Sequence, residues 1–304
     1  MMSFFIKKTI LGLTVFTLGL SSQSRADLES KFKYELQFEK RVLSVASQKV
    51  VNQYHVVFIA GIMNEMAPGY FHDNINSLKL ELGSKNYSVI RPQTTHSVEE
   101  NGLNLSKQLR NIYEKNKKKP LIIIAHSKGG LEVLDVLFRD SVFFNDAVTW
   151  AVFVQTPFMG SPVADFFFKK CDPKISKGLY CNAGYHSIMT DVSAMRLDHQ
   201  LSFATQSAFD LLHNKVRLVR ASKDVKDVSL LLKFSAELLA KQNEPNDGMV
   251  LLRDQIIPGF NLDLGVLESD HFNLLTDPFI SNQKPKFRRA FTRALFSELL
   301  HLSD

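Results

Sequence analysis

Ser127 is the residue whose surroundings most strongly suggest chemistry. It follows an uninterrupted apolar run at residues 121–124, and the residues two positions away on either side, Ala125 and Gly129, are small. Such a run is typical of a strand that is buried on both faces. Because neither face of that strand meets solvent, apolar and polar residues do not alternate along it. A strand that turns directly into a helix around one serine strains that serine and requires small neighbours. The hydroxyl could then act as a nucleophile; the alternative is a helix N-cap without chemistry.

A serine hydroxyl becomes an effective nucleophile only when a base takes its proton and an acid holds that base in place. The run A-H-S-K-G at residues 125–129 resembles the nucleophile elbow G-x-S-x-G of the α/β-hydrolases, with alanine first as in one branch of bacterial lipases. That superfamily has the chain order serine, acid, histidine. Of nine histidines, only His271 and His301 follow every candidate acid. His301 ends a C-terminal amphipathic helix, so the resemblance implies His271 as the base; a lone surface histidine is the alternative.

Asp247 is the first choice for the acid. It lies in N-D-G-M-V, which resembles the segment carrying the catalytic aspartate of secreted bacterial triacylglycerol lipases, and Gly248 permits a tight turn beside it. Asp224 is the runner-up acid, because it directly follows a predicted strand at residues 215–220 and many other hydrolases place the acid there. A surface turn is the alternative for both residues.

The resemblance also implies an oxyanion hole made of backbone N–H groups. One group follows the strand that precedes the first core helix, and the other belongs to the residue after the nucleophile. By position these are Ile62 and Lys128. Bacterial lipases usually carry His-Gly at that strand end, whereas this chain has Ala60-Gly61. The donors are backbone groups, so the mechanism does not depend on the missing histidine.

Residues 155–166, Q-T-P-F-M-G-S-P-V-A-D-F, are similar to the T-P-H-x-G-S-x-x-A-D stretch of those lipases, with Phe158 in place of histidine. The resemblance runs from about Tyr54 to Leu275 and implies no cofactor. A structural calcium is the one ion to consider, because those lipases have an aspartate ligand two residues after the histidine. Asn273 stands at that position here, which argues against calcium.

Strands and helices must bring these candidate site residues together. Apolar runs that predict strands alternate with helical patterns; they lie at residues 55–60, 88–91, 121–125, 148–154, 215–220 and 264–267. Such alternation predicts an α/β protein with a mostly parallel central sheet and helices on both faces. The resemblance implies an α/β-hydrolase domain at residues 54–304. It also implies a lid-like helical insertion at about 166–210, where the Phe and Met residues could equally be ordinary core.

The first 26 residues differ in kind from the rest. Lysines precede an apolar core at residues 9–20, and a small polar region ends at Ala26, which indicates a secretory signal peptide cut there. A retained anchor is the weaker alternative, because the core is short for a bilayer. Removal takes away Lys7, Lys8 and Arg25 and lowers the formal net charge from +6 to +3, which gives no indication of nucleic acid binding. Residues 27–53 are expected to be an N-terminal lead-in.

Export would place the chain in the periplasm or outside the cell. The two cysteines, Cys171 and Cys181, flank a short segment with Pro173 and Gly178 that can turn. In an oxidising compartment this spacing predicts a disulfide.

The sequence therefore predicts an exported serine hydrolase that cleaves carboxylic esters, a lipase or lipid-preferring esterase with transient contact with lipid surfaces. Phospholipid cleavage or acyl transfer would use the same three residues. An alternative of another class is a catalytically silent envelope module that binds lipid or protein. The sequence does not define the oligomeric state.

Overall fold

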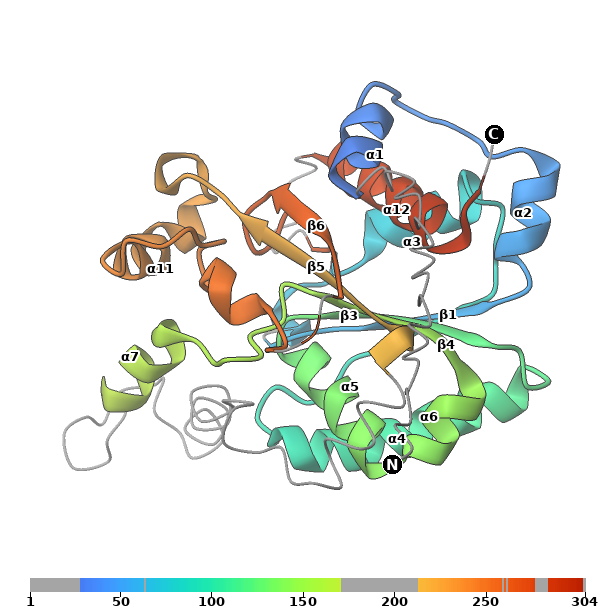
Figure 1. Cartoon of the computed structure of the whole chain (residues 1–304), viewed down its shortest axis with the longest axis horizontal. Helices are drawn as coiled ribbons and strands as arrows, with labels where there is room; N and C mark the ends of the chain where they lie inside the picture. The colour runs from blue at the N-terminus through green and yellow to red at the C-terminus, as the bar shows by residue number, and fades with distance from the viewer. Residues whose placement is uncertain are drawn as a thin grey trace, which may run out of the picture.

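The computed structural model describes residues 28–302, apart from residues 63, 171–212, 259, 261 and 277–283. In this part of the chain a six-stranded sheet forms the centre of the molecule (Figure 1). Its strands are β1 (His55–Ile59), β2 (Tyr87–Ile90), β3 (Leu121–His126), β4 (Val148–Val154), β5 (Val216–Ser222) and β6 (Asp263–Glu268). They lie in the order β2-β1-β3-β4-β5-β6, and every neighbouring pair is parallel. The predicted parallel sheet is confirmed.

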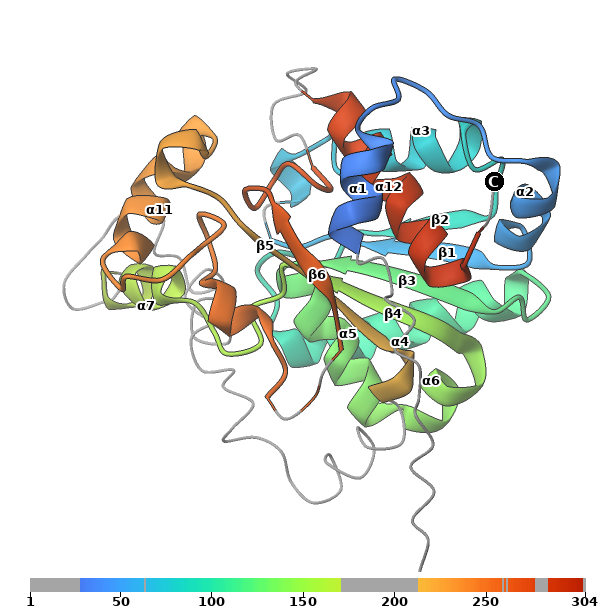
Figure 2. The same ribbon diagram turned by 45° about the horizontal axis from the view of Figure 1, so that its top comes forward.

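Helices cover both faces of the sheet, because parallel neighbours need crossover connections. One face carries α1 (Leu28–Glu35), α2 (Val45–Val51), α3 (His72–Leu80) and α12 (Pro285–Leu300), and the opposite face carries α4 (Val98–Lys115), α5 (Lys128–Arg139) and α6 (Ser141–Ala147) (Figures 1 and 2). Side chains alternate along each strand, so Val57 and Ile123 join the core under α4 and α5, while Phe58 and Ile124 join the core under α3 and α12.

The first helix packs against the last. Leu28 and Phe32 of α1 are buried in the core that α12 also lines. The Glu35 carboxylate accepts a hydrogen bond from Arg293 of α12, with Oε2 and Nε 2.6 Å apart, and the Arg293 side chain is fully buried. Residues of the expected lead-in therefore form part of the hydrophobic core.

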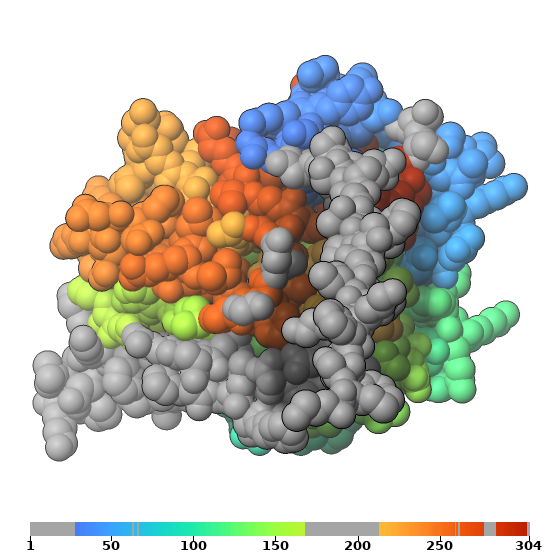
Figure 3. All heavy atoms as spheres, in the orientation of Figure 1, coloured from blue at the N-terminus to red at the C-terminus, as the bar shows by residue number. Residues whose placement is uncertain are grey.

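The remaining described elements lie mostly beyond the carboxyl ends of the strands. They are α7 (Pro162–Lys170), α11 (Lys233–Ala240) and the short 3₁₀ turns η1 (Asn64–Met66), η2 (His213–Lys215), η3 (Val225–Asp227), η4 (Leu230–Leu232) and η5 (Leu252–Gln255). Figure 3 shows α7 (yellow-green) next to α11 (orange) at one end of the molecule, and the two helices are in contact.

Several sequence predictions concern residues outside the described structure. The signal peptide, both cysteines and most of the predicted lid-like insertion lie there; residues 166–170 of that insertion belong to α7. Within the described residues, no helix combines the length and apolar character needed to cross a bilayer.

Candidate active site

Ser127 occupies the turn between β3 and α5 at the carboxyl edge of the sheet. Its backbone angles, φ 53° and ψ −130°, are unusual for a residue with a side chain. The Ser127 N–H donates to the carbonyl of Val154 at the end of β4, 3.0 Å away, which ties the turn to the sheet. A Cβ atom added to Gly129 would lie 2.5 Å from the Ala60 carbonyl oxygen. The small residue expected after the serine is therefore required by the close approach of α5 to β1.

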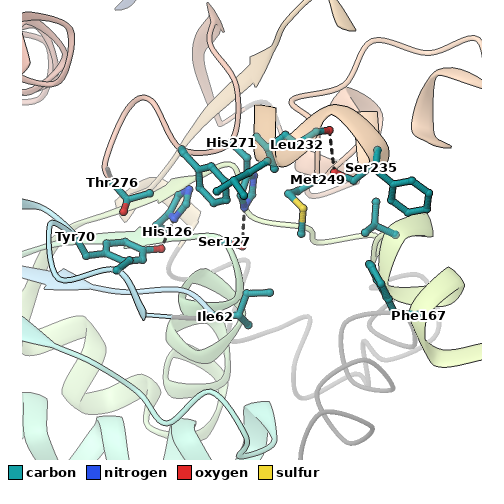
Figure 4. A pocket seen from close by; sticks show the side chains of 15 residues that line it. Ile62, Tyr70, His126, Ser127, Phe167, Leu232, Ser235, Met249, His271 and Thr276 are labelled. Atoms are coloured by element: carbon teal, nitrogen blue, oxygen red, sulfur yellow. Dashed lines mark hydrogen bonds between the residues drawn. The ribbon is translucent and has the colours of Figure 1, made fainter. Parts of the chain in front are cut away.

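The loops after β5 and β6 bring the other two candidates to Ser127. His271 Nε2 lies 3.0 Å from Ser127 Oγ, and His271 Nδ1 lies 2.8 Å from Asp247 Oδ2 (Figure 4). All three residues are buried or nearly so, with exposed fractions of 7%, 3% and 0% for Ser127, His271 and Asp247. The structure thus forms the hydrogen-bonded chain of serine, histidine and aspartate expected from the sequence.

Backbone and amide donors hold the Asp247 carboxylate. Its Oδ1 accepts from the N–H groups of Met249 and Val250, at 2.9 and 2.8 Å, and its Oδ2 accepts from Gln155 Nε2 at 2.9 Å. Gln155 also donates to the backbone carbonyl of Asp270, 3.1 Å away. Sequence reasoning missed Gln155; its place directly after β4, at the edge that carries Ser127, is the signal that could have found it.

Asp270 fixes the loop that presents His271. Its carboxylate accepts from the N–H groups of Phe272 and Asn273 and from the N–H and hydroxyl of Ser229. The loop is thereby attached to the segment before α11. No sequence signal identified this role, because Ser229 is distant in the chain.

Asp224, the runner-up acid, lies apart from this chain of hydrogen bonds. Its side chain is 59% exposed and pairs with Lys226 Nζ at 3.4 Å, while its Oδ1 accepts from the Lys226 N–H. Asp224 caps a short surface turn, as the alternative interpretation of this residue anticipated.

The two expected oxyanion donors lie at the same sheet edge. Ile62 follows the end of β1 and its side chain lines the pocket beside Ser127 (Figure 4), and Lys128 is the first residue of α5, where backbone N–H groups have no acceptor within the helix. A Cβ atom at Gly61 would lie 2.9 Å from the Ser127 Cβ, so glycine is required where β1 passes the nucleophile.

Ser127 and His271 open into a predominantly apolar pocket of about 380 Å³. In Figure 4, Tyr70, His126 and Thr276 lie on one side of Ser127, and Leu232, Met249 and Phe167 lie on the other. A pocket of this size is within the range that holds small organic ligands. Within the described residues, no cluster of three His, Cys, Asp or Glu side chains could hold a metal ion.

A parallel sheet with a serine at a strained strand-to-helix turn, and a histidine loop at the same edge, defines an α/β-hydrolase fold. Neither a protein-family model nor a curated protein matches this chain. Among solved structures, a metagenomic carboxyl esterase is similar with a TM-score of 0.62 at 18% identity, covering 86% of this chain and 77% of the esterase.

Two bacterial lipases are also similar. The mature lipase of Bacillus licheniformis gives a TM-score of 0.50 at 18% identity, covering 71% of this chain and 84% of the lipase. Lipase 1 of Pelosinus fermentans gives 0.50 at 14% identity, covering 83% of this chain and 100% of the lipase. The predicted α/β-hydrolase fold and the resemblance to bacterial lipases are confirmed, and at these identities the likeness establishes the fold alone.

Proposed function

We propose that this protein is a serine hydrolase that cleaves carboxylic esters, with a preference for lipid-like acyl groups. The observation that carries the proposal is the hydrogen-bonded chain from Ser127 through His271 to Asp247, which opens into an apolar pocket. The ester-cleaving relatives share the fold and lend the proposal support.

In the proposed reaction, Ser127 Oγ attacks the ester carbonyl while His271 Nε2 takes its proton. The Asp247 carboxylate accepts from Nδ1–H and stabilises the imidazolium. The N–H groups of Ile62 and Lys128 bind the oxyanion. Collapse of the tetrahedral intermediate expels the alcohol, which receives the proton from His271. Water, deprotonated by His271, then attacks the acyl-enzyme, releases the carboxylic acid and restores Ser127.

The lining of the pocket favours an apolar acyl chain. Val163 and Phe167 of α7, Leu232 and Met249 supply one side of it. Leu231 and Phe234 both line the pocket and are more than half exposed, at 51% and 56%, and adjacent Leu230 is 88% exposed. We propose that this apolar rim makes transient contact with the lipid surface from which the substrate enters.

We also propose that the chain is exported and that Cys171 and Cys181 form a disulfide outside the cytoplasm. The charged, apolar and small-residue regions of residues 1–26 support export, and the short turning segment between the cysteines supports the pairing.

The test is hydrolysis of p-nitrophenyl esters from acetate to palmitate by the mature protein. Burial contributes about 0.8 kcal/mol per CH₂ group, so we expect kcat/KM to rise about fourfold per added CH₂ until the pocket is filled.

The Ser127→Ala variant should lose turnover, whereas the control Ser106→Ala should keep it, because the Ser106 hydroxyl binds Asp140 away from the pocket. Equal turnover by wild type and Ser127→Ala, or none by wild type on any ester, contradicts the proposal. Transfer of the acyl group to added alcohol in place of water would identify an acyltransferase.

A further inference from the structure

A buried tyrosine hydroxyl connects the strand end beside the nucleophile to a second histidine. The Gly61 N–H donates to Tyr70 Oη, 2.9 Å away, and Tyr70 Oη is hydrogen-bonded to His126 Nδ1. Tyr70 is 5% exposed and His126 1% exposed, and both line the pocket next to Ser127 (Figure 4). Gly61 belongs to the loop of Ile62, and His126 directly precedes Ser127.

We assign the Tyr70 hydroxyl as the donor and His126 Nδ1 as the acceptor of the hydrogen bond between them. With this assignment the Tyr70 oxygen accepts from the Gly61 N–H and donates its one proton to Nδ1. Nδ1 then acts as an acceptor and carries no proton, and the single proton of the neutral ring lies on Nε2. The phenol keeps its proton, because burial raises the pKa of Tyr70.

His126 also packs against the proposed base. Its ring centroid lies 4.8 Å from that of His271, at an interplanar angle of 42°. Burial, together with the charge that His271 can carry, holds the pKa of His126 well below its ordinary value. A neutral His126 lets His271 become positively charged during the reaction without repulsion from a second cation.

We propose that Tyr70 and His126 are positioning residues that hold the oxyanion loop and the ring of His271 in one fixed arrangement around Ser127. This inference rests on the proposed function and deepens it. The Tyr70 hydroxyl fixes Gly61 and His126 by hydrogen bonds, and the ring of His126, held in this way, packs against the ring of His271.

Removing the Tyr70 hydroxyl tests whether its hydrogen bonds to Gly61 and His126 matter for the reaction. Tyr70→Phe keeps the ring, whose centroid lies 4.7 Å from that of Phe71, and removes both hydrogen bonds. We expect kcat to fall about 10- to 100-fold with KM within about threefold of wild type. The control Tyr113→Phe should retain wild-type kinetics, because Tyr113 lies on α4 against Phe143, outside the pocket.

Two variants of His126 separate hydrogen bonding from packing. Asparagine places its Oδ1 the same number of bonds from Cα as histidine places Nδ1, so His126→Asn can still accept from Tyr70. His126→Phe fills the ring volume but offers no acceptor. We expect kcat of His126→Asn to exceed that of His126→Phe by at least about threefold. If the His126 ring acted through packing alone, without its hydrogen bond to Tyr70, the order would be the opposite, because phenylalanine replaces the ring and asparagine leaves a cavity.

The rate of Ser127 labelling by a fluorophosphonate probe gives a second readout that does not require the natural ester. The inference is supported if Tyr70→Phe is labelled more slowly than wild type and if His126→Asn is labelled faster than His126→Phe. Labelling and kcat of Tyr70→Phe within twofold of wild type overturn it, as does His126→Phe matching or exceeding His126→Asn. A wild-type protein that neither labels at Ser127 nor cleaves esters instead refutes the proposed function, and the inference with it.

Discussion

Asp247 and His271 are joined by two hydrogen bonds. The carboxylate accepts from the ring at Nδ1, and the Asp247 backbone carbonyl accepts from the His271 N–H, each at 2.8 Å. The second bond fixes the backbone of the histidine loop relative to that of the acid loop. The ring of His271 therefore has little freedom to turn away from the carboxylate, and Nε2 stays directed at Ser127.

The Asp247→Asn variant should retain the fold and lose most activity. A neutral amide cannot stabilise the imidazolium or enforce the Nδ1–H tautomer, so we expect kcat to fall about 10³- to 10⁴-fold. The matched control Asp224→Asn should stay within about twofold of wild type, because Asp224 is exposed and contacts Lys226. Steady-state ester kinetics of both variants test this. If only the Asp224 variant lost activity, Asp224 and not Asp247 would be the acid that partners His271.

Sequence reasoning placed Ser127 and His271 in one site because each follows a predicted strand of a parallel sheet, and the carboxyl ends of such strands meet at one edge. It chose Asp247 because N-D-G-M-V resembles a segment of bacterial lipases. It could not place Gln155 and Asp270, since their partners are chosen by contacts through space rather than by chain position. Tyr70 lies in a loop before α3 and has no periodic pattern of its own. Its link to His126 emerges only when β1 and β3 are paired.

At the scale of a single element, the start of α5 is anchored by a buried ion pair. Lys128 Nζ lies 2.7 Å from Glu132 Oε1 and donates to the carbonyl of His96, 2.9 Å away; the two charged side chains are 3% and 2% exposed. Glu132 also accepts from Asn101 of α4. Burial raises the pKa of Glu132, against the opposing effect of Lys128. The pair attaches the helix that follows the nucleophile to α4.

Lys128→Met should destabilise the protein by about 3 kcal/mol, because it leaves Glu132 buried without its cation. Loss of Lys128 raises the folded-state pKa of Glu132 further above the unfolded value, so the unfolded state binds fewer protons and stability falls as pH rises. The deficit relative to wild type should therefore be larger at pH 8 than at pH 5.

Urea unfolding at both pH values measures this deficit. Arg139→Met is the matched control on the same helix: it breaks the partly exposed Arg139–Asp135 pair and should cost at most about 1 kcal/mol. A Lys128→Met deficit equal to that of the control would show that burial adds nothing to the pair.

The alternation of strands and helices was predictable because apolar runs such as β1 and β3 are buried on both faces and read clearly in the sequence. The part played by α1 was not. Its charged residues and loose helical spacing indicated an amphipathic lead-in without chemistry. Its place in the core depends on α12, more than 250 residues further along the chain.

For the whole molecule, the proposed export makes a prediction about the mature chain. Intact mass and N-terminal sequencing of protein recovered from the periplasm or medium should give a chain that begins at Asp27. Its mass should be lower than that of the reduced form by two hydrogens, about 2 Da, because Cys171 and Cys181 are joined. Protein that begins at Met1, or two alkylatable thiols without reductant, would contradict export or the disulfide respectively.

The pairing of α1 with α12 joins segments that are made far apart in time. Glu35 and Arg293 are 258 residues apart in the chain, and both side chains are buried in their ion pair. A nascent chain therefore cannot complete the core under α1 until α12 has been synthesised. Closing so long a loop costs conformational entropy before the contact is gained, so we expect the contact between α1 and α12 to form late in folding.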